Sequence, residues 1–275
     1  MGPTPLGPNF VNRMDFDDNA NSAATFPPMP KWLLTPLQTF VSLFLFVEVS
    51  AVVGLCLFPP VTLWLWVEPQ LTPGPQKVLL LCMLGALGYF IYGLTLLLVV
   101  PIARWVTFSL GTALGKYPYV SFRGYQWASY NALILIVRFS FINWIRATPF
   151  NVFFYRLMGM TVGARTQINT AVVADCNLIT IGDDTVIGGD VTLIAHAVEG
   201  PNLVTARVKI GSRVTVGLMS VVMPGCEIGD GAVLAANAVL KKGTIIPAGE
   251  IWGGVPARRL GVRGEKSAEA VQPVG

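Results

Sequence analysis

The sequence has little charge and almost no histidine. Only 12% of its 275 residues are Asp, Glu, Lys or Arg, whereas 53% are hydrophobic. A soluble domain usually carries about 25% charged residues, so this composition favours a membrane protein. The one histidine is His196. A zinc site made of three histidines is therefore excluded, and we expect no metal centre.

Acidic residues are absent from a long internal stretch. No Asp or Glu lies between Glu68 and Asp175, although basic residues recur there: Lys77, Arg104, Lys116, Arg123, Arg138, Arg146, Arg156 and Arg165. A basic block of this kind can bind nucleic acid. Aromatic and aliphatic residues dominate between the arginines, however, which favours a surface that faces anionic lipid headgroups. We expect no nucleic-acid partner.

Two further signals are missing. The four cysteines, Cys56, Cys82, Cys176 and Cys226, form no C-x-x-C pair, so we interpret them as small buried hydrophobic residues and not as a metal or redox site. No secretory signal is evident either, because the first apolar run begins near Trp32 and has no convincing cleavage site.

Two apolar runs are long enough to cross a bilayer. Residues 33–57 and 78–100 each exceed the ~20 residues that a spanning helix needs. Pro59 and Pro60 predict a break after the first run. The composition of residues 68–77 predicts a turn, so the two spans form a hairpin. Small residues of the second run would seat it against the first: Gly85, Ala86, Gly88 and Gly93.

Glu48 lies inside the first predicted span. An ionisable group at that depth is costly and often functional. The simpler interpretation, which we prefer, is a neutral carboxyl or one that is hydrogen-bonded to the partner helix.

The basic residues predict the orientation of the hairpin. The loop between the spans has only Lys77, whereas Arg104, Lys116 and Arg123 follow the second span. By the positive-inside rule, the C-terminal domain is cytoplasmic and the protein is an integral protein of an inner or plasma membrane.

The segment after the hairpin mixes aromatic residues with arginines at helical spacing. Arg138 and Arg146 interrupt any spanning run, which favours helices that lie in the plane of the interface. A third span over residues 132–145 remains an alternative. The expected organisation is a tail at 1–30, a hairpin at 31–108, interfacial amphipathic helices at 109–160, a repeat domain at 161–261 and a second tail at 262–275.

From Val162 onward the hydrophobic pattern has a period of six. Aliphatic residues stand at 162 and 168, then, after a shift of one, at 181, 187 and 193, and after a break at 210, 216, 222, 228, 234, 240 and 246. Glycine often follows the aliphatic residue, where it relieves the turn backbone. A small residue, such as Ala197 or Ser220, stands four positions after the aliphatic one, where it is expected to fit near a corner of the coil. Ordinary strands do not keep a period of six, so we predict a left-handed parallel β-helix with three faces per coil.

The repeat resembles the hexapeptide-repeat acyltransferases. Residues 245–261, IIPAGEIWGGVPARRLG, look like the closing coil of that family, with Gly254, Pro256 and Arg258 in its usual G-x-P-A-[KR] segment. A narrower resemblance covers roughly residues 35–260. That region is similar to the membrane-bound C-terminal domain of poly-lysine-synthetase-type nonribosomal peptide synthetases, in which two spanning helices precede each β-helix-like unit.

His196 is the candidate catalytic base. It lies just before the break at 199–209, which is expected to loop out of the coil, and such loops commonly carry sites. Acyl transfer from a thioester needs a base that titrates near neutrality. The family uses a histidine in such a place, so the resemblance implies that role here. Glu199 and Asp175 are the candidates for a partner that fixes the tautomer of the imidazole ring.

The resemblance also implies the donor and the assembly. The donor would be acyl-CoA, or an acyl group on phosphopantetheine, lying in a groove between adjacent subunits of a trimer. The residues that match the closing segment are the expected binding residues: Trp252, Gly253, Gly254, Pro256 and Arg258. Membrane lipids and a carrier protein are further expected partners.

Three alternatives differ from this reading. A γ-type carbonic anhydrase shares the β-helix but needs three histidines, so it is rejected. A second alternative is a non-catalytic trimeric β-helix scaffold tethered to the membrane. A third is a stand-alone unit that couples aminoacyl groups delivered by a separate carrier protein into amides, since no adenylation or carrier domain is evident in the sequence.

Overall fold

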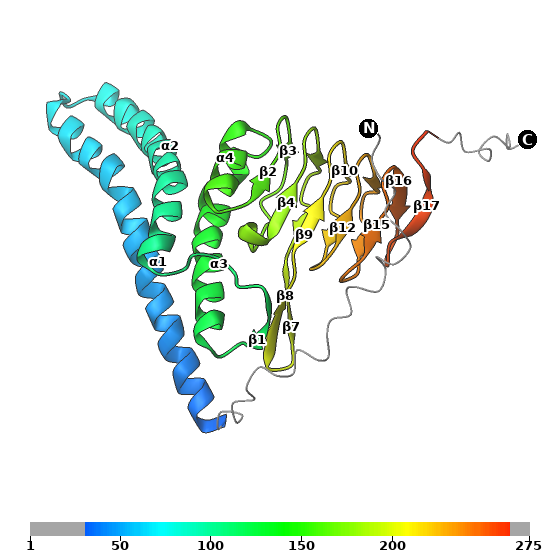
Figure 1. Ribbon diagram of the computed structural model, residues 1–275. Helices are drawn as coiled ribbons and strands as arrows, with labels where there is room; N and C mark the ends of the chain where they lie inside the picture. The colour runs from blue at the N-terminus through cyan, green and yellow to red at the C-terminus, as the bar shows by residue number, and fades with distance from the viewer. Residues whose placement is uncertain (1–30, 265–275) are drawn as a thin grey trace, which may run out of the picture. The chain divides into compact units, whose positions relative to one another are not determined.

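The computed structural model describes residues 31–264, so the tail expected at 1–30 and all but the first three residues of the tail expected at 262–275 lie outside the described residues. The chain divides after Phe40 into two units. In the first unit, residues 31–40 form the beginning of helix α1 (Lys31–Val67). The second unit starts at Val41 and holds the remainder of α1 and every other described element (Figure 1).

Helix α1 does not break at Pro59 and Pro60. It is continuous over 37 residues, about 55 Å at 1.5 Å per residue, so the predicted break was wrong. Apolar residues favour the helix on both sides of the prolines. Proline in such helices is tolerated where side chains supply local hydrogen bonds, and Thr62 Oγ1 donates to Phe58 O at 2.7 Å and to Pro59 O at 2.9 Å.

A one-turn helix η3 (Glu68–Gln70) leads to helix α2 (Pro75–Val106). Glycines of α2 lie at close contacts: a Cβ on Gly88 would be 3.3 Å from Pro60 Cβ, and one on Gly93 would be 2.1 Å from the Phe141 ring. The remaining surface of both helices is largely apolar and exposed. In the most apolar stretch of each helix, only 17% of the residues of α1 and 28% of those of α2 are buried. A core helix of a soluble protein would be mostly buried.

Glu48 is buried and its partner lies on the third helix. Both of its carboxyl oxygens lie 2.7 Å from Ser129 Oγ on helix α3 (Phe122–Ser140). Ser129 in turn contacts Ser109 in the segment after α2. Of the two expected alternatives, a neutral carboxyl stays untested, and the hydrogen bond is formed with α3 and not with the second helix of the hairpin. Residues 109–160 contribute polar groups to the hairpin that their hydrophobic pattern does not reveal.

The region predicted as interfacial helices contains helices and one strand. Strand β1 (Gly115–Pro118) precedes α3, and η4 (Ile142–Trp144) and α4 (Pro149–Leu157) follow it. Helix α3 starts at a conventional cap, in which Ser121 Oγ accepts from Gly124 N. The strand was missed because its four residues acquire their structure from pairing with β8, which lies 87 residues further along the chain.

Three residues of the basic block bind the β-helix. Arg156 donates to Val162 O at 2.7 Å, Arg146 pairs with Asp190, and Arg165 pairs with Asp184. Helix α4 adds Tyr155, whose hydroxyl donates to Thr170 O at 3.1 Å. Arg156 and Tyr155 bond to carbonyls of the first coil, whereas Asp184 and Asp190 flank β5 of the second coil, so these three arginines pair with the β-helix itself.

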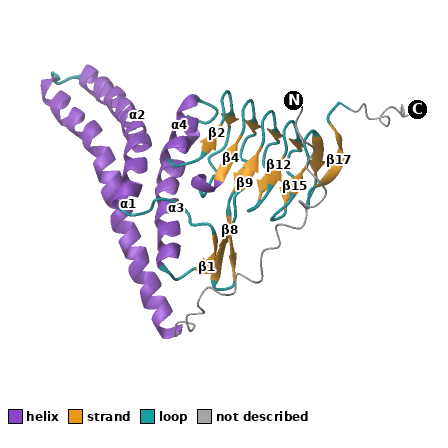
Figure 2. Cartoon of the chain, viewed as in Figure 1, coloured by secondary structure: helices purple, strands orange, loops and turns teal. Residues whose placement is uncertain are grey.

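The C-terminal half is a parallel β-helix with three faces (Figure 2). One face orders the strands β2-β4-β9-β12-β15, the second β3-β5-β10-β13-β16, and the third β6-β11-β14. The strands are β2 (Thr161–Val162), β3 (Gln167–Ile168), β4 (Ile179–Ile181), β5 (Val186–Ile187), β6 (Thr192–Leu193), β9 (Val208–Ile210), β10 (Thr215–Val216), β11 (Val221–Val222), β12 (Glu227–Ile228), β13 (Val233–Leu234), β14 (Val239–Leu240), β15 (Ile245–Ile246) and β16 (Glu250–Gly253).

The aliphatic residues with a period of six fill the interior, as predicted. Ile187, Val216 and Leu234 are each fully buried and stack on one face. The role of the glycines differs from the prediction. A Cβ on Gly182 would lie 2.6 Å from the carbonyl carbon of Gly211 in the next coil, so glycine permits the coils to approach closely. Ala197 is not in a coil corner, because the chain leaves the β-helix there.

The described chain stays ordered past the boundary expected at 261. Strand β17 (Arg258–Val262) folds back antiparallel on β16. Arg263 then donates to Arg213 O at 3.2 Å. The boundary was misplaced because the last strand pairs with β16 and not with the hexapeptide repeat.

Candidate active site

The period of six is interrupted at two places. One interruption contains Asp175, and the other contains His196. At the one-residue shift, a short helix η5 (Cys176–Leu178) interrupts the coil, and Asp175 immediately precedes it. At the longer break, the chain leaves strand β6 and His196 is the first residue of strand β7 (His196–Glu199). The structure brings these two residues together.

The insertion that carries His196 is a β-hairpin. Strand β7 pairs antiparallel with β8 (Asn202–Thr205), and β1 adds a third strand on the other side of β8. The sheet order β1-β8-β7 is separate from the three faces of the β-helix. The segment after α2 therefore helps to hold the hairpin, and Thr205 Oγ1 also donates to Ala113 O at 2.6 Å.

Asp175 is a fully buried carboxylate with four partners. Its Oδ1 accepts from Thr112 Oγ1 at 2.7 Å and from Asn131 Nδ2 at 3.0 Å. Its Oδ2 accepts from Ala195 N at 3.2 Å and lies 2.5 Å from His196 Nδ1. A carboxylate partner fixes the proton on Nδ1 and leaves Nε2 as the unprotonated nitrogen of the neutral ring.

The environment keeps Asp175 ionised. Burial raises the pKa of its carboxyl group, but the hydrogen bond and charge of His196 and the hydrogen bonds of Thr112 and Asn131 outweigh burial, so the pKa lies below the ordinary aspartate value. Hydrogen bonds to the charged form act in this direction. The carboxylate is therefore available as a fixed negative charge next to the imidazole.

The imidazole is partly accessible and is held on one side by an aromatic ring. The side chain of His196 is 21% exposed. Trp127 of α3 packs edge-on against it, with ring centroids 4.9 Å apart and an interplanar angle of 72°. An ionised carboxylate at one nitrogen and partial exposure of the ring form the arrangement that a general base needs.

Sequence reasoning missed Thr112, Asn131 and Trp127. Asn131 is a polar residue on an otherwise apolar helix face, and Thr112 lies in the segment FSLGTAL, where exposed apolar residues alternate with buried polar ones. A polar residue among apolar ones indicates a buried hydrogen bond. The sequence does not identify the partner, because Asp175 lies 44 residues after Asn131 and 63 residues after Thr112.

Glu199 lies away from the imidazole nitrogen that Asp175 occupies. It is at the far end of β7 and pairs with Lys242, whose hydrogen bond and charge lower the pKa of the Glu199 carboxyl. Of the two candidate partners of His196, the structure brings only Asp175 into contact with the ring among residues 31–264.

Gly254 and Ala257 of the closing segment lie further along the face to which β6 belongs, whereas Trp252 and Gly253 are part of β16 on the second face. Val239 of β14 donates to Gly254 O at 3.0 Å and accepts from Ala257 N at 2.9 Å. Since the face is ordered β6-β11-β14, the segment lies three strand spacings from β6, about 14 Å at ~4.8 Å per strand. Trp252 Nε1 donates to Glu250 Oε2 at 2.7 Å, and Arg258 is exposed. None of these residues touches His196 in the described part of the chain.

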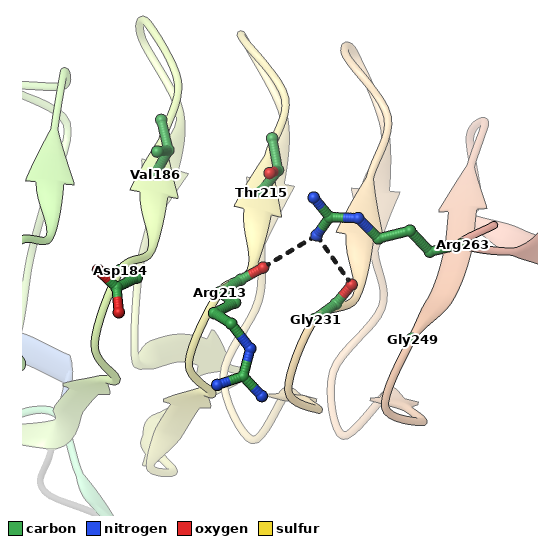
Figure 3. Close-up of a pocket in the computed structure, with 7 residues that line it drawn as sticks. All are labelled: Asp184, Val186, Arg213, Thr215, Gly231, Gly249 and Arg263. Atoms are coloured by element: carbon green, nitrogen blue, oxygen red, sulfur yellow. Dashed lines mark hydrogen bonds between the residues drawn. The ribbon is translucent and has the colours of Figure 1, made fainter.

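A hollow of ≈ 610 Å³ lies on a different face of the β-helix. Figure 3 shows its lining, in which Arg263 extends across the coils toward the backbone oxygens of Arg213 and Gly231. Val186 and Thr215 line it from the face of β5 and β10. The hollow includes no residue that the sequence predicted for the site. Among residues 31–264, no group of three or more His, Cys, Asp or Glu side chains is placed to hold a metal ion.

Comparisons with known proteins agree with the repeat. The model of the family described as bacterial transferase hexapeptide (six repeats) matches residues 207–242. The putative acetyltransferase YvoF of Bacillus subtilis is 32% identical over 150 residues, which cover 50% of this chain and 86% of YvoF.

The resemblance to poly-amino-acid synthetases is also confirmed. The Delta-poly-L-ornithine synthetase of Acinetobacter baumannii is 26% identical over 177 residues, 62% of this chain. The present chain spans only 13% of that enzyme. Among solved structures, the hexapeptide-repeat acetyltransferase VCA0836 of Vibrio cholerae, in complex with acetyl coenzyme A, is 27% identical over 38% of this chain and 60% of that one, with a TM-score of 0.35.

Proposed function

The chain belongs to the hexapeptide-repeat acyltransferases, and from this premise we propose that it moves an acyl group from a thioester to a hydroxyl or amine, with His196 as the general base. The observation that carries the proposal is the pair formed by His196 Nδ1 and the buried carboxylate of Asp175, 2.5 Å apart. The pair leaves Nε2 free to act on a substrate.

The proposed reaction needs one proton carrier. Nε2 of His196 takes the proton from the acceptor O–H or N–H as the oxygen or nitrogen attacks the thioester carbonyl carbon. The carbon–sulfur bond then breaks, and the thiolate that leaves takes the proton from the imidazolium. The products are the acylated acceptor and a free thiol, and His196 returns to its neutral form.

Asp175 supports both protonation states of the ring in this scheme. It holds the proton on Nδ1 while Nε2 acts as the base, and its negative charge stabilises the imidazolium that forms during transfer. The carboxylate does not need to accept a proton, which agrees with a pKa below the ordinary value.

A coenzyme A thioester is the donor class that the family resemblance implies. We place its binding along the face that ends at the closing segment, where Trp252, Gly253, Gly254, Pro256 and Arg258 are the candidate binding residues. A left-handed coil and a trimer, in which the groove lies between two copies of the chain, complete this proposal.

A membrane-proximal acceptor is the class that fits the surroundings of the dyad. Two exposed apolar helices support anchoring in a membrane, with the β-helix on the cytoplasmic side. The segment that leaves α2 points Phe108, Leu110 and Leu114 outward, each about half exposed or more, and its buried Thr112 binds Asp175. The dyad thus lies beside an apolar surface that continues α2, which favours a lipid-linked hydroxyl or amine.

His196→Ala tests this function. We expect its transfer rate to fall by roughly 10²–10⁴-fold, the usual contribution of a general base. The assay follows thiol release from acetyl-CoA by the purified full-length protein in detergent, with a lipid extract of the source membrane as the acceptor. Size-exclusion elution and the thermal midpoint verify folding. A folded variant with full transfer would remove the proposed base, whereas an absence of transfer by the wild type would favour the scaffold role.

A second candidate is the coupling of aminoacyl groups delivered on a carrier protein. The similarity to the poly-ornithine synthetase over 62% of this chain favours it. Transfer from aminoacyl-pantetheine, with none from acetyl-CoA, would select this function. His196→Ala would abolish activity under either donor.

A further inference from the structure

We propose, given the acyl-transfer function above, that Thr112 and Asn131 are positioning residues for the reaction. They hold the carboxylate of Asp175 in the orientation that fixes the tautomer and the direction of the His196 ring. Neither residue belongs to the β-helix, so the activity of the base depends on the segments that connect the β-helix to the apolar helices.

The bonds to Asp175 leave its carboxylate no freedom to rotate. A carboxylate has about four lone-pair sites, and four donors occupy them. Thr112 and Asn131 bind Oδ1, while Ala195 N and His196 Nδ1 bind Oδ2. If the two donors on Oδ1 are lost, the buried charge keeps only the donors on Oδ2, and the carboxylate turns to share them.

Asn131 fixes the backbone as well as the side chain of Asp175. Its Oδ1 accepts from Asp175 N at 3.0 Å while its Nδ2 donates to Asp175 Oδ1 at 3.0 Å. Asp175 has φ +54°, in the left-handed region that residues with a side chain rarely adopt. The amide of Asn131 therefore stabilises an unfavourable conformation at the position where the orientation of the carboxylate is set.

Thr112 is itself held in place from both sides of its peptide. Its N–H donates to Asn177 Oδ1 and its carbonyl accepts from Asn177 Nδ2, both at 2.9 Å. This reciprocal pair sets the loop after α2 against η5, two residues from Asp175. Thr112 thus reaches Asp175 from a fixed backbone, as a positioning residue requires.

Helix α3 presents two of its residues to the dyad. Asn131 lies one turn after Trp127, and residues four apart share one face of a helix. Trp127 contacts the imidazole and Asn131 contacts the carboxylate. The coil itself supplies Ala195 N to the pair among the described contacts, so the hexapeptide repeat alone does not orient the base.

The matched variants Thr112→Val and Thr112→Ser test the proposal. Valine keeps the shape of threonine without its hydroxyl, whereas serine keeps the hydroxyl. We expect Thr112→Val to lower kcat by up to about 10²-fold, because a displacement of about 1 Å in a reacting group can cost that much, with KM for acetyl-CoA unchanged. Thr112→Ser is expected to retain most of kcat. Asn131→Ala removes both bonds to Asp175 and is expected to lose more kcat than Thr112→Val.

A spectroscopic reading separates positioning from general damage. His196 is the only histidine, so ¹⁵N NMR of histidine-labelled full-length protein in detergent reports this ring alone. We expect the proton on Nδ1 in the wild type and in Thr112→Ser. In Thr112→Val and Asn131→Ala, the neutral ring is expected to show a mixture of both tautomers.

The outcomes distinguish this proposal from the function on which it rests. Should Thr112→Val and Asn131→Ala keep kcat and the Nδ1 tautomer while His196→Ala is inactive, the positioning role is wrong and the catalytic role stands. An equal loss of kcat in Thr112→Ser and Thr112→Val would also overturn it. Full activity of His196→Ala removes the function instead. If Thr112→Val fails to fold, the kcat of Asn131→Ala and the tautomer of its His196 ring test the positioning role instead.

Discussion

The regular coils and the two places where the coil is interrupted satisfy their polar groups differently. In a regular coil, the backbone groups bond to the next coil, as Val216 does to Gly188 N and Leu234 to Gly217 N, and the interior is aliphatic. At the interruptions, side chains from distant segments replace the neighbouring coil. Asp175 and His196 both lie at interruptions, so in the proposed function the repeat supplies rigidity and its breaks supply the reacting groups.

The coils and the interruptions are also stabilised by different interactions. A buried aliphatic residue contributes through packing that many neighbours share, whereas the carboxylate of Asp175 depends on four identified donors. Changes in a coil should therefore affect unfolding, and changes at an interruption should affect activity or its dependence on pH.

The largest effect on stability is expected in a coil. Leu234→Ala removes a fully buried side chain from the stack, which should lower the free energy of unfolding by about 2–5 kcal/mol. Thermal or denaturant unfolding of the detergent-solubilised protein measures it. The kcat of the folded fraction should not change, because Leu234 lies on a different face from the dyad.

Val198→Ala is the matched control for that change. Val198 lies on the hairpin that carries His196 and is 59% exposed, so its truncation should change stability by about 0.5 kcal/mol or less. If Val198→Ala lowered the free energy of unfolding as much as Leu234→Ala does, packing would stabilise the hairpin and the coils alike, contrary to this comparison.

A smaller effect is expected from acid. The pKa of Asp175 lies below its ordinary value of 3.8, so its ionised form stabilises the fold above pH 3.8, and this contribution is lost as the pH falls through the lowered pKa. The difference in unfolding free energy between the wild type and Asp175→Asn should be constant above pH 3.8 and shrink below it. Thermal midpoints between pH 2 and 6, roughly the range in which carboxyls titrate, measure this. A difference that grows toward low pH would contradict the lowered pKa.

The smallest effect is expected at the second acidic candidate. Glu199→Gln breaks an exposed pair with Lys242, and exposed pairs contribute little. Its kcat/KM should stay within about twofold of the wild type, because no contact with the His196 ring is lost. A loss comparable to that of Asp175→Asn would assign the orienting role to Glu199 instead.

The sequence predicted the repeated part of the molecule well because its signal is local and redundant. Each coil repeats the same aliphatic position, and Ile187, Val216 and Leu234 occupy the interior as expected. The interruptions of the period were visible too, and they marked the neighbourhoods of Asp175 and His196.

The remaining parts depended on contacts that no local pattern encodes. Glu48 was expected to bond within the hairpin, but its partner is Ser129 on α3. Asn131 and Thr112 carry no motif, and they reach Asp175 only after the helices have packed. Strand β1 forms because β8 offers it an edge. In each case the sequence shows a polar or short segment in an apolar region, and only the tertiary arrangement identifies its partner.

Each end of the β-helix carries a covering segment. A stack of like rungs has no intrinsic length, and an open final rung offers unpaired backbone to any other chain. Here α4 binds carbonyls of the first rung through Asn151, Tyr155 and Arg156, and β17 pairs with β16 of the last rung. In the proposed trimer, copies of this chain are therefore expected to meet through their flanks, where an assembly closes on itself, and not end to end, where it would grow into a fibre.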